Sequence, residues 1–283
     1  MKGIILTNAN YDTPSTLYQS SRLMDEFQKL GVDVTVLKND GTFCNLNNTF
    51  DLDFCIFLDK DTLTAEFLER RGVRVFNSAT SISICDDKVK TYLSLFDTGV
   101  VIPKTIGGVY RYVKCEASDN LLDYYERELS YPMVVKLNSS SLGEGVFLAR
   151  DREQLKSILY NISDKPHHVQ EFIGRGGEDY RLILVGGKVV ATMKRSSDTD
   201  FRSNVELGGV ATKVVLDAKY ITLAERVAQK LSLDYCGIDI ISNNDMPVLL
   251  EVNSNAYFGG IESVTGVNVA RSYANHVLKV LKR

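Results

Sequence analysis

The chain has 283 residues, of which 44% are hydrophobic and 24% are charged. This is enough apolar sequence to bury a sizeable core divided into two or three domains or subdomains. A formal net charge of -3 gives no reason to expect a general nucleic-acid-binding surface. No apolar run approaches the ~20 residues that span a bilayer, and the opening residues do not read as a signal peptide. We therefore expect a cytoplasmic protein without a membrane segment.

Cysteine and histidine usage argues against the common disulfide and zinc frameworks. The five cysteines are odd in number and include no CxxC pair, which favours neither a zinc ribbon nor a closed disulfide set. The three histidines have no spacing that would place two of them as ligands on one helix face. A reducing compartment fits best, and a histidine-based zinc site is not expected.

Short apolar runs alternate with amphipathic segments through the first third of the chain. We expect strands at Gly3–Thr7, Val32–Leu37, Phe54–Leu58 and Val73–Phe76, and helices at Ser15–Leu30, Asp61–Arg71 and Ala79–Thr98. Strand, helix and strand in this order predict a parallel α/β domain with right-handed crossovers over residues 1–95. No GxGxxG is present, so a dinucleotide fingerprint is absent. The Asn8–Thr16 loop is either a substrate wall at the carboxyl end of the first strand or an ordinary connection.

A lysine interrupts an apolar strand in the next part of the chain. Lys136 lies in the predicted strand Pro132–Leu137, and because burying an unpaired ammonium group is costly, it should meet an anion. The small and polar residues 138–145 follow, and backbone amides in such a turn can cradle phosphate oxygens. The GK[ST] of a Walker loop is missing. A hairpin loop beside a snorkelling lysine explains the pattern about as well.

The later elements mix strands and helices in a less regular order. We expect an extended segment at Val101–Thr105, helices at Leu121–Leu129, Asp151–Asn161, Leu216–Leu231 and Ile261–Arg283, strands at Val146–Ala149 and Val169–Ile173, and a hairpin of Arg181–Val185 with Lys188–Lys194. Arg195–Gly209 is predicted as a polar loop whose cationic and amide groups either grip a phosphoryl group or form a solvated surface. We divide this part of the chain into a central unit, residues 96–173, and a C-terminal unit, residues 174–283.

Residues 236–255 predict a hairpin that places two carboxylates side by side. With the turn centred on Asp245, Asp239 lies directly opposite Glu251, where like charges are destabilising. Period-two alternation puts Asn253 on the same face as these acids. The other face is then apolar, with Ile238, Ile240, Val248, Leu250 and Val252. Two acids and an amide form an all-oxygen set that suits Mg²⁺ or Mn²⁺, and the alternative is a solvent-facing pair screened by water.

Seven motifs in fixed order give the chain a resemblance to a known family. They are DDK at 86–88, VVKLN with the glycine loop that ends at 145, VQEFI at 169–173, DYR at 179–181, DFRSN at 200–204, GIDI at 237–240 and EVNSN at 251–255. From about Asp87 to the C-terminus the chain resembles the ATP-grasp fold and, within it, the RimK-type carboxylate–amine (alpha-L-glutamate) ligases. The fold class implied is mixed α/β and α+β, with an N-terminal α/β (pre-ATP-grasp) domain before the ATP-grasp units.

The resemblance implies a binding site for ATP. Lys136 would contact the α and β phosphates, Lys88 would be a second phosphate contact, and Asp179 would lie at the ribose. The backbone of the segment Glu171, Phe172 and Ile173 would hold the adenine edge.

The resemblance also implies a metal site and a catalytic segment. Asp239, Glu251 and Asn253 match the family's ligands for Mg²⁺ or Mn²⁺, two ions in all. Arg202, Ser203 and Asn204 match a segment that contacts the nucleotide and the acyl phosphate. Of these, Arg202 and Asn204 would be catalytic, with Arg202 stabilising the negative charge that develops on the acyl group.

The activity implied is ATP-dependent formation of an amide or peptide bond through an acyl phosphate. The partners would be ATP, a carboxylate and an amine, with glutamate or another amino acid added to a peptide, protein or metabolite. Residues 254–262 depart from the family's Ser-Pro-Gly turn and Leu-Glu-Gly run, which leaves the amine substrate open. A D-alanine–D-alanine-type small-molecule ligase and a non-catalytic ATP-binding regulatory protein stay as alternatives, and self-association into a homo-oligomer is left open.

Overall fold

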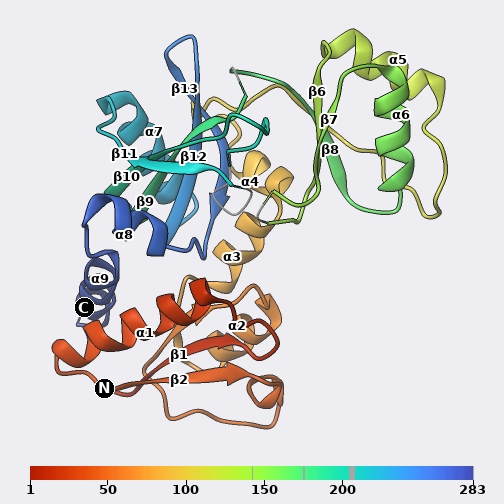
Figure 1. The fold of residues 1–283 in the computed structure, drawn as a ribbon. Helices are drawn as coiled ribbons and strands as arrows, with labels where there is room; N and C mark the ends of the chain where they lie inside the picture. Colours follow the sequence, from red (N-terminus) through yellow and green to blue (C-terminus); the bar gives the residue numbers. More distant parts are fainter. Residues whose placement is uncertain (142, 175, 204–207, 283) are drawn as a thin grey trace.

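The computed structural model describes residues 1–141, 143–174, 176–203 and 208–282. Three β-sheets form three lobes, and helices α3 (Ala79–Asp86) and α4 (Lys88–Ser94) lie between the N-terminal lobe and the other two (Figure 1). Within these residues, no helix combines the length and the apolar character needed to cross a bilayer.

The N-terminal sheet is parallel, as the strand–helix–strand order predicts. Its strands lie in the order β2 (Val34–Asn39), β1 (Gly3–Asn8), β3 (Phe54–Leu58) and β4 (Arg74–Phe76). Helix α1 (Pro14–Lys29) packs on one face, and α2 (Thr62–Arg70) and α3 pack on the other. Every residue of β3 is buried because both faces of the sheet are covered. A short 3-10 helix, η1 (Thr42–Cys44), follows β2.

The central lobe is an antiparallel sheet with two helices on one face. Its strands lie in the order β5 (Thr105–Gly107), β8 (His167–Glu171), β6 (Met133–Leu137) and β7 (Val146–Ala149). Helices α5 (Asp119–Glu128) and α6 (Arg152–Asn161) pack against Met133, Val135 and Val169. Because side chains alternate along a strand, Lys136 and Gln170 project from the opposite face.

The C-terminal sheet has five antiparallel strands covered on both faces. The order is β11 (Val210–Lys213), β10 (Lys188–Ser196), β9 (Glu178–Val185), β12 (Tyr235–Asn243) and β13 (Met246–Asn253). Helix α7 (Ala218–Lys230) packs on one face, and α8 (Gly259–Thr265) and α9 (Val269–Leu281) pack on the other. The predicted hairpin turn at Gly186 and Gly187 is confirmed, with a positive φ at both residues.

One face of this sheet changes from apolar to charged along the strands. Ile183 and Val185 of β9 pack with Met193 of β10 in the core beneath α8 and α9. Further along the same face, by the period-two rule, the side chains are Asp179, Arg181, Arg195 and Asp239. The apolar side chains at one end anchor the sheet in the core. The charged side chains at the other end are available to form a site.

The predicted helix over Ala79–Thr98 is wrong at its middle. Asp87 adopts an extended conformation that separates α3 from α4, and its carboxylate accepts hydrogen bonds from the amides of Val89 and Lys90. Aspartate is a strong N-cap residue, so it begins a new helix where the periodicity alone suggests continuation. The break sets Lys88 at the first position of α4.

The predicted C-terminal helix over Ile261–Arg283 is also divided. Gly266 ends α8 in the left-handed region, with φ of 73°. Asn268 then caps α9, accepting a hydrogen bond from the amide of Arg271. Glycine at a helix C-terminus and asparagine at the next N-terminus are the expected residues at such a break.

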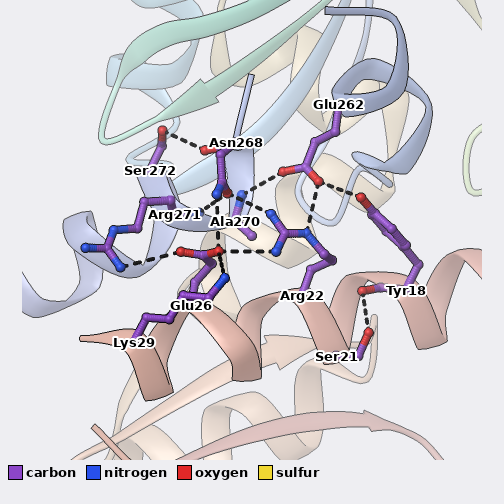
Figure 2. Close-up of polar contacts among 10 residues, drawn as sticks. All are labelled: Tyr18, Ser21, Arg22, Glu26, Lys29, Glu262, Asn268, Ala270, Arg271 and Ser272. Atoms are coloured by element: carbon purple, nitrogen blue, oxygen red, sulfur yellow. Dashed lines mark hydrogen bonds and ion pairs between the residues drawn. The ribbon is translucent and has the colours of Figure 1, made fainter. Parts of the chain in front are cut away.

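The N-terminal lobe is held to the C-terminal lobe by a polar junction between α1 and the α8–α9 segment (Figure 2). The carboxylate of Glu262 accepts hydrogen bonds from the hydroxyl of Tyr18 at 2.7 Å and from Nε of Arg22 at 3.3 Å. Its other oxygen accepts from the amide of Ala270 at 3.1 Å, at the start of α9. Glu262 therefore joins α1 to both C-terminal helices.

A second buried carboxylate, Glu26 of α1, completes this junction (Figure 2). It accepts hydrogen bonds from Lys29 at 2.8 Å, from Arg22 at 3.2 Å and from the Asn268 amide at 3.2 Å, and Arg271 lies 3.5 Å away. The hydrogen bond from Lys29 and the contacts with Asn268 and Arg22 outweigh burial and lower the pKa of Glu26 to about 2. The carboxylate is therefore charged at neutral pH.

Candidate active site

A cavity of about 570 Å³ lies between the central sheet and the charged end of the C-terminal sheet. The central lobe contributes Val134, Lys136 and Gln170 to its wall. The C-terminal sheet contributes acids and arginines, and Lys88 of α4 completes the wall between the two. Residues that line the cavity include Lys88, Lys136, Ser140, Gly143, Phe172, Ile173, Asp179, Arg195, Arg202, Ser203, Asp239, Leu250 and Glu251.

Two buried ammonium groups face this cavity. Nζ of Lys136 donates to Oε1 of Gln170 at 2.7 Å, and this partner is neutral. Burial lowers the pKa of Lys136 to about 8, with a further contribution from the neighbouring Lys88 and an opposing one from Glu251. Nζ of Lys88 donates to the Ser140 carbonyl at 3.0 Å and lies 3.2 Å from Glu251. Two cations at one cavity wall favour an anionic ligand.

The N-terminal lobe touches the loop that was predicted to cradle phosphates. Nζ of Lys60, which follows β3, donates to Oγ of Ser141 at 2.8 Å and pairs with Asp86 at the end of α3. Lys60 therefore links three parts of the chain beside the cavity. Asn8, at the start of the predicted substrate wall, instead donates to Asp59 within the N-terminal lobe.

The segment predicted to hold adenine lies beside the cavity. Strand β8 ends at Glu171, whose amide donates to the Lys104 carbonyl at 2.9 Å and whose carboxylate accepts from the Lys104 amide at 2.7 Å. Phe172 and Ile173 follow and line the cavity. The rings of Phe172 and Phe201 lie 6.4 Å apart. The backbone of Glu171 is thus engaged inside the protein, and Phe172 and Ile173 come after the strand pairing ends.

The predicted pairing of Asp239 with Glu251 is confirmed, but it arises from a β-bulge that the alternation of apolar and polar residues did not reveal. Asn244 and Asp245, both with positive φ, form a two-residue turn, which alone would set Asp239 opposite Leu250. A β-bulge between Asp239 and Ile240 shifts the register by one residue and brings Glu251 opposite Asp239.

The same bulge corrects the predicted apolar face. Leu250 was expected in the core with Ile240, but Leu249 pairs with Ile240 and is fully buried there. Leu250 lines the cavity instead. A single extra residue in β13 reverses the direction of the side chains on one side of it.

A row of alternating charges crosses the C-terminal sheet beside the cavity, in which Asp179, Arg195 and Asp239 are buried and Arg181 is half-buried. The cross-strand pairs are Arg195 with Asp179 and Arg181 with Asp239. Arg195 donates to both oxygens of Asp179, and Arg181 donates to both oxygens of Asp239 at 2.8 and 2.7 Å. Nη2 of Arg195 also lies 3.0 Å from Oδ2 of Asp239. Arg195 is only 2% exposed.

The two acids of this row respond differently to their surroundings. Burial disfavours the charge of Asp239, but Arg181 and Arg195 outweigh it and lower the pKa of Asp239 to about 2. Burial raises the pKa of Asp179, and the neighbouring charge of Asp239 adds to this rise while Arg195 opposes it. Asp239 is therefore the firmly ionised member of the pair.

The residues predicted to bind Mg²⁺ or Mn²⁺ are Asp239, Glu251 and Asn253. Among the side chains that the structure describes, no three from His, Cys, Asp and Glu converge into a cage. Mg²⁺ needs fewer, because it keeps several waters and is commonly held by one or two carboxylates together with substrate phosphates. Asp239 and Glu251 line the cavity beside both lysines. Asn253 is not among the lining residues, but its Nδ2 is buried without a hydrogen-bond partner among the described residues, and turning the amide over would present an oxygen there. This donor set fits a hard divalent cation.

The DFRSN segment reaches the cavity in part. Arg202 donates to both oxygens of Asp200 and, through Nη1, to the Gly143 carbonyl at 2.9 Å. It thereby connects this segment to the glycine loop. Ser203 is buried beside Asp179, to which it donates a hydrogen bond. Asn204 lies outside the described residues.

Sequence reasoning missed the role of the two arginines that pair with these acids. Arg195 was expected at the start of a polar loop, but it lies inside β10 and is fully enclosed. The available signal was its spacing: Ala191, Met193 and Arg195 alternate along one face of the strand, so the arginine continues an inward series. Arg181 was noted as part of the DYR motif and of a predicted strand, but its contact with Asp239 was not predicted.

Similarity to known proteins shows the family of this chain. A model of the RimK-like ATP-grasp domain matches residues 85–277. The beta-citrylglutamate synthase B of Danio rerio is 35% identical over 227 residues, which are 79% of this chain and 55% of that protein. This chain thus spans about half the length of that relative. A probable alpha-L-glutamate ligase of Halorhodospira halophila is 33% identical over 280 residues, which are 90% of this chain and 89% of that protein.

Solved structures agree on the fold. A RimK domain protein ATP-grasp from Sphaerobacter thermophilus has a TM-score of 0.73 at 19% identity, covering 98% of this chain and 99% of that one. A D-alanine–D-alanine ligase from Bacillus anthracis complexed with ATP has a TM-score of 0.76 at 17% identity, covering 100% and 97%. At these identities the likeness shows the fold alone. The family model and the sequence relatives show more, and the chain belongs to the RimK-like ATP-grasp family.

Proposed function

We propose that this protein is an ATP-dependent ligase that joins a carboxylate to an amine through an acyl phosphate. One observation carries the proposal: a single cavity is lined by two buried lysines and by two carboxylates of adjacent strands. Lysines suit phosphate oxygens, and the carboxylates suit a divalent cation that bridges them. A metal-bound nucleoside triphosphate requires both.

The parts of the nucleotide are assigned by the kinds of residue that line the cavity. Phe172 and Ile173 offer an apolar surface for adenine, beyond the point where Glu171 is engaged by Lys104. Lys136 and Lys88 are assigned to the phosphates. Asp179 is assigned to the ribose, with Ser203 beside it.

The metal ligands assigned are Asp239, Glu251 and Asn253, holding two ions of Mg²⁺ or Mn²⁺. When bound, such ions neutralise charge on the triphosphate and on the transferred phosphoryl group. The protein's own part is to hold the two acids close together and to place a cation beside each. Arg181 pairs with Asp239, and Lys88 pairs with Glu251.

Arg202 and Asn204 are assigned to the reacting carboxylate. A carboxylate oxygen of the substrate attacks the γ-phosphorus, and ADP leaves with the bridging oxygen. The amine nitrogen then attacks the acyl carbon and inorganic phosphate leaves, which completes the amide. Arg202 lies at the cavity wall and contacts the glycine loop through Gly143, a position from which its guanidinium can stabilise negative charge on the acyl phosphate.

The amine substrate is assigned as an amino acid, with glutamate first, because the relatives are named for glutamate ligation and glutamate-containing products. One feature sets this chain apart from the family's usual Leu-Glu-Gly run. A Cβ added at Gly259 would lie 3.1 Å from the ring of Tyr18, so the glycine lets α1 close on the start of α8. We also assign the protein to the cytoplasm, since the described cysteine side chains, those of Cys55, Cys85, Cys115 and Cys236, are free.

Trapping of the acyl phosphate tests the proposal. Purified protein is incubated with ATP, Mg²⁺, hydroxylamine and pooled carboxylates that include N-acylated amino acids and acidic peptides, and hydroxamate and phosphate are measured together. A hydroxamate formed in step with phosphate release is the expected result. Phosphate without hydroxamate would indicate an ATPase, and nucleotide binding with neither product would indicate a regulatory protein.

A further inference from the structure

Arg195 contacts two acids of the candidate site, Asp179 and Asp239, with one guanidinium group. Its Nε donates to Oδ1 of Asp179 at 2.7 Å. Its Nη2 is shared between Oδ2 of Asp179 and Oδ2 of Asp239, 3.0 Å away. Asp179 is the carboxylate assigned to the nucleotide and Asp239 is one assigned to the metal. A planar guanidinium fork can serve two carboxylates at once, whereas a lysine ammonium acts as a point charge.

The lone pairs of Asp239 limit what it can offer to a metal ion. A carboxylate has about four acceptor positions. Arg181 takes one on each oxygen, and Arg195 takes a second on Oδ2. The position that stays open is on Oδ1. The arginines therefore decide which oxygen of Asp239 faces a cation, and Arg195 does so while holding Asp179.

Because Arg195 and its partner acids are buried, breaking their contacts is costly. Arg195 is 2% exposed, and the side chain of Asp239 is 5% exposed. In such surroundings an uncompensated charge is strongly unfavourable. A change in charge at Asp179 must therefore alter how tightly Arg195 holds Asp239.

We propose that Arg195 is a positioning residue that couples nucleotide binding to metal binding, by orienting Asp179 and Asp239 through one shared guanidinium. Arg181 differs from it, because its bidentate contact is with Asp239. The proposal rests on the assignment of these acids to nucleotide and metal. It predicts that changes at Arg195 affect both ligands, and that changes at Arg181 affect the metal alone.

Calorimetric titration with a nonhydrolysable ATP analogue separates these effects without any turnover. Two quantities are measured for each variant: the Kd in EDTA, and the factor by which saturating Mg²⁺ tightens it. For Arg195→Lys we expect a weaker Kd in EDTA and a smaller Mg²⁺ factor, each by about tenfold, the lower end of the range for loss of an outer-shell partner. For Arg181→Lys we expect the Mg²⁺ factor alone to fall.

Lys188→Met is the matched control, since Lys188 is a cation of the same strand that pairs with Glu225 at the surface. It should leave both quantities unchanged. An Arg195→Lys protein that folds, as judged by circular dichroism, and loses only one of the two quantities would overturn the coupling. If the wild-type protein itself fails to bind the analogue, the proposed function fails rather than this inference.

Asp179→Asn tests the same coupling when a change at the fully buried Arg195 prevents folding. Asparagine keeps the shape and an acceptor oxygen, and it removes a charge that burial already disfavours. The positive charge of Arg195 is then left to Asp239 alone and competes more strongly with the cation. The Mg²⁺ factor should fall several-fold even though Asp179 is not assigned to the metal. An unchanged factor, beside a weaker Kd in EDTA, would show that nucleotide binding and metal binding are independent.

Discussion

Lys136 is a buried cation whose hydrogen-bond partner is the neutral Gln170. Burial lowers its pKa to about 8, so in the free protein it loses its proton as the pH rises through that value. Phosphate oxygens stabilise the protonated form and raise this pKa in the complex. Nucleotide binding therefore takes up a proton above pH 8.

The affinity for ATP is accordingly expected to fall as the pH rises above about 8. Calorimetric titration of the ATP analogue at a series of pH values measures this decline. The Lys136→Met variant should bind more weakly at pH 7 and show no such decline. A wild-type affinity that is level from pH 7 to pH 10 would argue against Lys136 as a phosphate contact.

Glu251 contacts Lys88 at 3.2 Å and faces Asp239 across the hairpin. The Glu251→Gln variant keeps the shape of the side chain but loses the charge that attracts a cation. We expect turnover to fall on the order of 100-fold or more, at least the upper end of the range for loss of a residue that only supports a metal ligand, with little change in the thermal melting temperature. Near-normal hydroxamate formation by this variant would refute its assignment to the metal.

At the scale of single elements, Asp87 decides how Lys88 is presented. Its carboxylate caps α4 by accepting from Val89 and Lys90, at 2.9 and 3.0 Å. The Asp87→Ala variant should lose about 1 kcal/mol of stability, the usual cost of removing such a cap, and should bind the ATP analogue more weakly because Lys88 begins this helix. Asp87→Ser should restore much of both.

The N-cap of α6 supplies the comparison for this variant. Asp151 accepts from the amide of Gln154 at 2.8 Å, on a helix that covers the far face of the central sheet. Asp151→Ala should cost a similar amount of stability and leave the affinity for the analogue unchanged. Urea denaturation and calorimetry report the two effects separately. Equal losses of affinity in the two alanine variants would mean that the cap of α4 has no specific role at the site.

Sequence patterns predicted elements well where one physical cause acted alone. The parallel N-terminal strands and the Gly186–Gly187 turn follow from burial on both faces and from the need for positive φ, and both are read from local residues. The hairpin of Asp239 and Glu251 was harder, because its register includes a bulge at Leu250 that the alternation of residue types does not reveal.

Buried charge was the least predictable feature of the site. Arg195 looks like a surface residue in a polar stretch, and its burial depends on Asp179 and Asp239 lying on two other strands. Pairing across a sheet brings these residues together from distant parts of the chain. The family resemblance supplied the acids and Arg181 through their motifs, but it did not supply Arg195, which contacts both Asp179 and Asp239.

At the scale of the whole molecule, the position of the N-terminal lobe depends on the junction of α1 with α8 and α9. Glu26 and Glu262 are both buried there, and the cations around them come from both lobes (Figure 2). Apolar packing of Phe27 against the same helices adds to the junction. The ionic part of this contact can be removed by pH, which the apolar part cannot.

Glu26 has a pKa of about 2 in the folded protein, against an ordinary value of 4.5. Because the folded pKa is the lower one, the carboxylate adds stability that is fully present above about pH 4.5 and is lost as the pH falls toward 2. Glu26→Gln should therefore reduce the free energy of unfolding at pH 7 by roughly 2 kcal/mol, the range for hydrogen bonds to a charged group. The difference between wild type and variant should shrink toward zero as the pH falls toward 2.

Urea denaturation at several pH values measures this difference. Glu66→Gln, which removes an exposed pair with Arg70, is the control expected to change little. A difference that is the same at pH 7 and at pH 2.5 would mean that Glu26 stabilises the junction through its shape and not through its charge.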